Sequence, residues 1–227
     1  MKSVELRLHG QEFDLAESTR ALQESVNDIY RDAGYLDVST TAPTYSTPHK
    51  DLNDYAVNLT ASIQSGDIYR ISSIKLPTVL SISPSDLDHA ANLQVGSPAS
   101  AAALRLATAE LAKTCTDAGY LDATAKVETS KDIPAHTIAY AFTITPGEVY
   151  HFASVDTSAL TPQQQQSIAH NFYPAPNAIF NQQLTSALAN ALAQLRLSHM
   201  PSFLRRTYPA NHTVVVVLKP ASAPTPP

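Results

Sequence analysis

The six residues Asp-Ala-Gly-Tyr-Leu-Asp at positions 32–37 occur again, unchanged, at positions 117–122. The two copies are 85 residues apart in a chain of 227 residues. A shorter motif follows each copy: Gly-Asp-Ile-Tyr at 66–69 and Gly-Glu-Val-Tyr at 147–150. Because a six-residue identity rarely arises by chance in so short a chain, the sequence predicts an internal structural repeat.

The rest of the composition excludes several classes of protein. Net charge is -5, with 15 Lys and Arg against 20 Asp and Glu, which argues against a nucleic-acid binder. The single Cys excludes a disulfide framework and a Cys-based zinc site. Six Gly leave no glycine-rich phosphate loop, and no apolar run approaches the length of a membrane-spanning helix. No secretory signal opens the chain, so we expect either a cytoplasmic protein or one whose signal lies outside this sequence.

The residues from the first Gly-x-x-Tyr motif, at 66–69, to the second, at 147–150, predict one strand, two helices and two strands. Ser83-Pro84 has the pattern of a helix N-cap followed by Pro at the first helical position. Leu104, Ala107, Leu111 and Cys115 recur at helical spacing, which predicts one buried helix face. The predicted elements are a strand at 69–76, helices at 84–92 and from 97–100 to 117, and strands at 120–128 and 137–145.

The two ends of the chain follow the same plan less completely. Towards the C-terminus we predict a strand at 149–155, a helix capped by Thr161-Pro162, a helix opened by Asn181, strands at 203–208 and 213–219, and a disordered Pro-rich tail at 220–227. Near the N-terminus we predict strands at 4–8, 36–42 and 55–63 and a helix at 14–31 with Leu15, Leu22, Val26, Ile29 and Tyr30 on its core face.

This order resembles the polypeptide-transport-associated (POTRA) domain. The resemblance is carried by the Gly-Tyr that closes the second helix, at 34–35 and 119–120, and by the Gly-x-x-Tyr at 66–69 and 147–150. It implies an α+β fold of tandem β-α-α-β-β repeats, each a small mixed three-stranded sheet covered on one face by two helices. The implied domains are an incomplete first unit at 1–66, a second at 67–146, a divergent third at 147–219 and the tail at 220–227.

The resemblance also implies where the chain binds its partners. POTRA repeats occur in the periplasmic arms of outer-membrane β-barrel assembly factors and two-partner secretion transporters, where the strand after the Gly-Tyr is the edge that pairs with other chains. An edge strand offers unpaired N–H and C=O groups to an extended peptide. The alternative that these edges are covered by neighbouring units stays open. The edge residues implied here are Leu36, Val38, Thr40, Leu121, Ala123, Thr124 and Val127.

Several residues are of types that can carry out catalysis or bind metals, but their sequence contexts indicate structural roles. His9, His49, His136 and His212 lie in turn-like contexts without metal-ligand spacing, and Cys115 falls on a buried helix face. Asp37 and Asp122 recur one repeat apart, too distant to act as an acid–base pair, so we expect turn or strand-start roles. Arg205-Arg206 could contact an acidic partner, although a solvated strand end is the simpler interpretation. The Asn-x-Thr sequences at 58–60 and 211–213 lie in or beside predicted strands.

The sequence therefore favours a non-enzymatic periplasmic scaffold or chaperone-like arm, possessing no cofactor, metal or catalytic residue. Its expected partners are unfolded or outer-membrane polypeptides, or a subunit of the assembly machinery, without nucleic acid. The alternative is a module that binds a small ligand or an envelope glycan in the groove between helix and sheet. A third hypothesis, a hydrolase with a site built across units, would require a buried Asp or His with a strongly shifted pKa.

Overall fold

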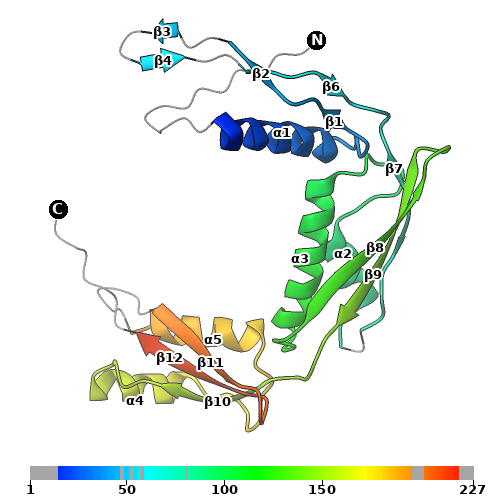
Figure 1. The fold of residues 1–227 in the computed structure, drawn as a ribbon. Coiled ribbons are helices and arrows are strands. Elements are labelled where there is room, and N and C mark those ends of the chain that lie inside the picture. The colour runs from blue at the N-terminus through cyan, green and yellow to red at the C-terminus, as the bar shows by residue number, and fades with distance from the viewer. Residues whose placement is uncertain are drawn as a thin grey trace. The chain divides into compact units, whose positions relative to one another are not determined.

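The structure is a computed structural model that describes residues 15–46, 49–51, 54–56, 59–79, 81–195 and 202–219 (Figure 1). The predicted strand at 4–8, the tail at 220–227, His9 and Asn58 lie outside the described residues. Packing divides the chain into two compact units: one comprises Met1–Leu76, Ala91–Ala109 and Lys126–Thr143, and the other comprises Pro77–Ala90, Glu110–Ala125 and Ile144–Pro227. Over the part of the chain that is described, no helix has the length and apolar character needed to cross a membrane.

The described residues form five helices and twelve strands in an α+β arrangement, as predicted. The elements are α1 (Leu15–Asp32), β1 (Ser39–Thr40), β2 (Thr44–Tyr45), β3 (His49–Asp51), β4 (Asp54–Ala56), β5 (Leu59–Thr60), β6 (Ile63–Gln64), β7 (Arg70–Lys75), α2 (Pro84–Ala91), α3 (Ala101–Asp117), β8 (Thr124–Asp132), β9 (Thr137–Thr145), β10 (His151–Asp156), α4 (Pro162–Asn171), α5 (Gln182–Ala193), β11 (Ser202–Tyr208) and β12 (Thr213–Lys219).

The N-terminal part departs most from the prediction. In place of the strands expected at 36–42 and 55–63, the described residues between 39 and 64 form six short strands, which pair as β1-β6, β2-β5 and β3-β4. Helix α1 buries Leu22 and Val26 as expected, but Ile29 is 65% exposed and its predicted place in the core is wrong. Strand β1 is tied to α1 at Gln23 and Asn27, through hydrogen bonds to Thr40, and Ile29 lies beyond these contacts.

The middle sheet has the order β7-β9-β8. Strands β7 and β9 pair in parallel, with Ile71 opposite Ile138 and a shift in register before Ser73. Strand β9 forms at the predicted residues and its burial alternates, since Ile138, Tyr140 and Phe142 are buried while Ala139 and Ala141 between them are only partly covered. The small mixed three-stranded sheet expected from the resemblance is therefore present here.

The C-terminal sheet repeats this plan with the order β10-β12-β11. Strand β12 lies in the centre, parallel to β10 and antiparallel to β11. Helix α4 begins with the predicted cap, a reciprocal pair of hydrogen bonds between Thr161 and Gln164, and helix α5 begins at Asn181. Both helices pack on one face of the sheet (Figure 1), and the core they form consists of Tyr150, Ile168, Phe180, Leu184, Leu188, Ala191, Leu192, Val214, Val216 and Leu218.

The repeated Gly-Tyr closes helices α1 and α3 in the same way. Gly34 and Gly119 have φ of +95° and +109°, a region that side chains rarely occupy. The N–H of Tyr35 donates to the carbonyl of Tyr30 at 3.0 Å, and the N–H of Tyr120 donates to that of Cys115 at 3.0 Å. This six-to-one bond is the mark of a Schellman cap, which satisfies carbonyls that the helix end leaves free.

Replacement of Gly119 should destabilise the protein more than replacement of Gly96. A Cβ at Gly119 would lie 2.4 Å from Cγ2 of Ile179, whereas a Cβ at Gly96, at φ +87°, meets nothing within 4 Å. We expect Gly96→Ala to lower the free energy of unfolding by about 1 kcal/mol through backbone strain alone. Gly119→Ala adds the steric clash and should lower it by roughly 2–3 kcal/mol. Urea unfolding measures both, and equal losses would contradict the packing described here.

Candidate functional site

The candidate site consists of two edge strands, each of which follows directly after a long helix. Strand β8 follows α3 and ends the middle sheet; strand β11 follows α5 and ends the C-terminal sheet. Among the described residues, each of these strands bonds to one neighbouring strand only, so its other side carries backbone donors and acceptors that have no partner within the sheet.

The structure places only part of the predicted edge residues in strands. Thr124 and Val127 lie in β8, whereas Leu121 and Ala123 precede it, because the N–H of Ala123 donates to the carbonyl of Tyr120 at 3.1 Å and forms a turn. The strand therefore begins at Thr124 rather than at 120, and the prediction of its start is wrong. Leu121 instead packs against the C-terminal core.

The corresponding residues near the N-terminus are less suited to an open edge. Leu36 and Val38 precede β1, again because of a turn, in which the N–H of Val38 donates to the carbonyl of Tyr35 at 3.3 Å. Val38 is only 6% exposed. Thr40 lies in β1, but its carbonyl accepts from Gln23 at 3.1 Å and its hydroxyl donates to Asn27 at 2.7 Å. The extended strand predicted at 36–42 is therefore not formed.

In each repeat, the aspartate that ends the six-residue motif binds a buried tyrosine of the Gly-x-x-Tyr motif. The hydroxyl of Tyr69 donates to the carboxylate of Asp37 at 2.7 Å, and the hydroxyl of Tyr150 donates to that of Asp122 at 2.7 Å. Both tyrosines belong to the Gly-x-x-Tyr motif and are almost completely buried. Asp37 and Asp122 thus have structural roles in turns, as predicted, and we name these two contacts the first and second tyrosine ties.

A lysine distinguishes the first tyrosine tie. Lys131, at the end of β8, pairs with the carboxylate of Asp37, and its ammonium nitrogen lies 4.3 Å from the centre of the Tyr69 ring. The Lys131 ammonium and the Tyr69 hydroxyl together hold the pKa of Asp37 below its ordinary value. In the second tie, the Asp122 carboxylate raises the pKa of Tyr150.

Strand β11 is the edge that the sequence analysis did not select. All seven of its residues are exposed, and the large side chains of Phe203, Leu204 and Tyr208 are 41–47% exposed. The selection relied on the Gly-Tyr motif, which residues 198–200 lack. The available signal was positional: β11 stands in the same place after α5 as β8 does after α3.

A hollow of about 240 Å³ lies beside β11. It contains one aromatic side chain from β11 and one that precedes α5, together with one acidic and one basic group. We call it the β11 hollow; its lining residues are Thr116, Asp117, Phe180, Asn181, Gln182, Thr185, Phe203 and Arg205.

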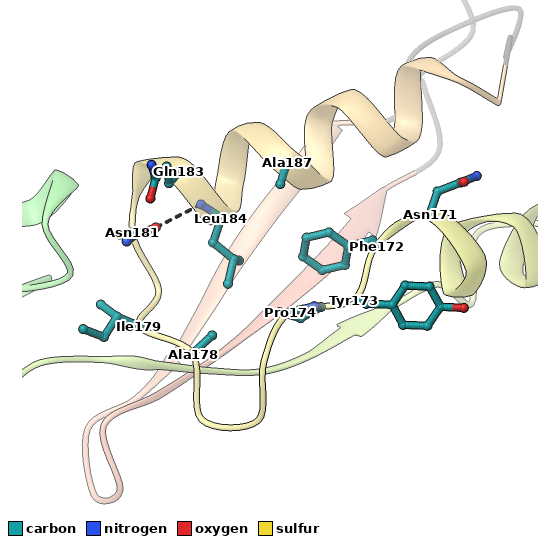
Figure 2. Close-up of a pocket in the computed structure, with 10 residues that line it drawn as sticks. All are labelled: Asn171, Phe172, Tyr173, Pro174, Ala178, Ile179, Asn181, Gln183, Leu184 and Ala187. Carbon is teal, nitrogen blue, oxygen red and sulfur yellow. Dashed lines mark hydrogen bonds between the residues drawn. The ribbon is translucent and has the colours of Figure 1, made fainter.

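A larger groove of about 450 Å³ runs along α5 and is lined without charged side chains. Figure 2 shows Phe172 facing α5, whereas the Tyr173 ring extends away from Leu184. The side chain of Asn181 is already used, since it accepts from the N–H of Leu184 at 2.9 Å. We call it the α5 groove; it is lined by Asn171, Phe172, Tyr173, Pro174, Ala178, Ile179, Asn181, Gln183, Leu184 and Ala187.

Cys115 is fully buried on α3 as predicted, and burial raises the pKa of its thiol. His136 and His212 lie in turns at φ of +48° and +50°, while the side chain of His49 is outside what the structure describes. Within the described ranges, no three His, Cys, Asp or Glu side chains gather as a metal site would require.

Comparison with known proteins identifies the fold. A crystal structure of POTRA domains 3–5 of Haemophilus influenzae BamA matches with a TM-score of 0.60 and 18% identity, over 93% of this chain and 83% of that chain. The chain has the fold of tandem POTRA domains. No protein-family model matches the sequence, and no curated protein does.

Two further POTRA-containing structures match at lower scores. Haemophilus ducreyi BamA lacking POTRA domains 1–3 gives a TM-score of 0.47 at 16% identity, over 66% of this chain and 29% of that chain. POTRA domains 1–2 of Anabaena Omp85 give 0.41 at 12% identity, over 69% of this chain and 97% of that chain. The fold assignment rests on the H. influenzae structure alone.

Lys131 should control the titration of Asp37. Because the folded pKa of Asp37 is lowered, this carboxylate stabilises the fold above its unfolded pKa of about 3.9 and loses that contribution as pH falls through the lower, folded value. We expect Lys131→Met to raise the titration midpoint of Asp37, and Tyr69→Phe to raise it less, in an NMR titration of the carboxyl carbon. Lys126→Met removes a cation from the same strand as a control. A midpoint that Lys131→Met leaves in place would refute this account.

Proposed function

We propose that this chain is a non-enzymatic scaffold, or chaperone-like arm, that binds polypeptides by adding them as a strand to its sheet edges. We propose further that it works in the periplasm, in the assembly or secretion of outer-membrane proteins. The POTRA fold supports this, since the similar structure is of POTRA domains 3–5 from Haemophilus influenzae BamA.

The observation that carries the proposal is the exposure of β11. This strand is seven residues long, pairs along its whole length with β12, and has every residue exposed. A second strand laid along its free side would complete a row of backbone hydrogen bonds without displacing any element of the C-terminal sheet. The exposed Phe203, Leu204 and Tyr208 would supply apolar contact on both faces.

Strand β8 is the second proposed edge, and it includes the predicted residues Thr124 and Val127. The C-terminal end of β8 is held in place, because Lys131 pairs with Asp37. A peptide added to β8 would therefore meet a strand that is already held at one end. We place the principal edge at β11 for this reason.

The α5 groove gives less support to the alternative of a small-ligand or glycan module. Such sites combine an apolar lining with several polar groups that converge on the ligand. Here the Asn181 side chain is engaged as a helix cap, and the amide of Asn171 donates to Ser167 at 3.4 Å. Few polar groups are left free to converge on one ligand.

Proline in β11 should weaken strand addition where the sheet tolerates it. Neighbouring N–H groups in a strand point to opposite sides, so of Phe203→Pro and Leu204→Pro one removes a donor that faces solvent and the other removes a bond to β12. We expect the variant that loses the solvent-facing donor to keep its fold. It should bind a seven-residue Thr-Val peptide, with Gln at its centre, at least about fivefold more weakly than the wild-type chain does. Fluorescence anisotropy with the labelled peptide measures this.

Ala153→Pro is the matched control, because Ala153 lies at the irregularity of β10, where the register against β12 shifts. It should leave peptide affinity unchanged. Hydrogen exchange should show slower exchange of amides in residues 202–208 when the peptide is bound. Undiminished affinity in the folded Pro variant, or protection confined to other strands, would count against binding at β11.

A further inference from the structure

Strand β11 carries two neighbouring arginines that face opposite sides of its sheet. Arg205 stands opposite Val216, which is buried, and Arg206 stands opposite Val215, which is only half-buried. Directly opposed residues of an antiparallel pair share a face. Arg205 therefore lies on the helix-covered side and Arg206 on the open side of the C-terminal sheet.

The charges around the two arginines differ. Arg206 acts on Asp156 of β10, whose pKa is lowered mainly by hydrogen bonds from Ser158 and in smaller part by the Arg206 charge. Arg205 lines the β11 hollow together with Asp117, but the carboxylate of Asp117 is paired with Lys113 at 2.6 Å. Among the residues that the structure describes, no ion pair includes Arg205. The hollow is thus lined by an arginine that has no ion-pair partner among the described residues.

We propose that the segment added to β11 carries an acidic side chain that enters the β11 hollow and pairs with Arg205. This inference rests on the proposed function and names the class of its partner: an extended segment with a carboxylate on the side that faces the helices. Charge complementarity selects this occupant, since an arginine beside a partly enclosed hollow favours a carboxylate over an amide or an ammonium group.

The same charges disfavour a second copy of this chain as the occupant. An antiparallel pair of β11 strands centred on Arg205 would place Arg205 opposite Arg205, and a shift by one position would place it opposite Arg206. Like charges directly opposite each other destabilise a strand pair. The arginines thereby oppose self-association at the edge while leaving the backbone free for an acidic segment.

The test compares three seven-residue Thr-Val peptides that carry Glu, Gln or Lys at the centre, each binding to the full chain. Since the peptide register is not fixed, each set is also made with the variable residue one position to either side. We expect one Glu peptide to bind roughly tenfold more tightly than its Gln counterpart, and the Lys peptide to bind most weakly. The preference should weaken as salt is raised.

The variants Arg205→Glu and Arg206→Glu change the net charge equally on opposite faces of one strand, so each controls for the other. Arg205→Glu should reverse the order so that the Lys peptide binds most tightly, and Arg205→Gln should abolish the preference. Arg206→Glu should preserve the order for the same peptides. Circular dichroism confirms that each variant is folded.

Each other outcome overturns a distinct claim. Equal affinity for the Glu, Gln and Lys peptides would overturn the acidic partner while leaving strand addition intact. Equal effects of Arg205→Glu and Arg206→Glu would show a general charge effect and overturn the role of Arg205. If no peptide bound the wild-type chain, the proposed function would itself fail, and the inference with it.

Discussion

In each repeat, a buried tyrosine links the two repeated motifs, because its hydroxyl, its N–H and its carbonyl all need hydrogen-bond partners. The N–H of Tyr150 donates to the carbonyl of Gly119 at 2.9 Å, its carbonyl accepts from Phe180 at 2.8 Å, and its hydroxyl donates to Asp122. Tyr69 makes the same three bonds to Gly34, Ala99 and Asp37. A tyrosine buried to this depth requires such partners. The two motifs recur as a pair because one supplies the carbonyl and carboxylate that the tyrosine of the other needs.

The ties extend beyond the residues that the sequence repeat reveals. His136 lies in the turn between β8 and β9, and His212 lies in the turn between β11 and β12, both with positive φ. Each histidine ring stands edge-on to the tyrosine of a tie, with ring centroids 5.7 Å apart for His136 and Tyr69 and 5.5 Å apart for His212 and Tyr150. Their carbonyls accept from the residues that follow those tyrosines. The two turns are related in sequence, since residues 134–137 are Pro-Ala-His-Thr and residues 209–213 are Pro-Ala-Asn-His-Thr. The extra Asn211 shifts the spacing, and the shared contact with the tyrosine shows that the two histidines are equivalent.

Local patterns were sufficient where burial alone sets the structure. The helical spacing of Ala107, Leu111 and Cys115 predicted a buried helix face, and the sequences at 137–145 and 213–219 predicted strands; the structure confirms all three. They failed at Leu121 and Val38, whose apolar character suits a strand equally well. There a turn, fixed by the helix cap and by the distant tyrosine, decides the outcome. The edge at β11 was overlooked for the same reason, since it depends on position in the sheet and the Gly-Tyr motif is missing.

The two open edges differ because the ties do. At β8 the ammonium of Lys131 is drawn to Asp37 and lies over the Tyr69 ring, so this edge strand takes part in the first tie. The second tie consists of Tyr150 and Asp122 with no corresponding lysine among the described residues, and no residue of β11 contributes its side chain to it. Arg205 of β11, unlike Lys131 of β8, has no ion-pair partner among the described residues. The feature that distinguishes the two ties therefore also determines which edge has both its backbone and its charge free.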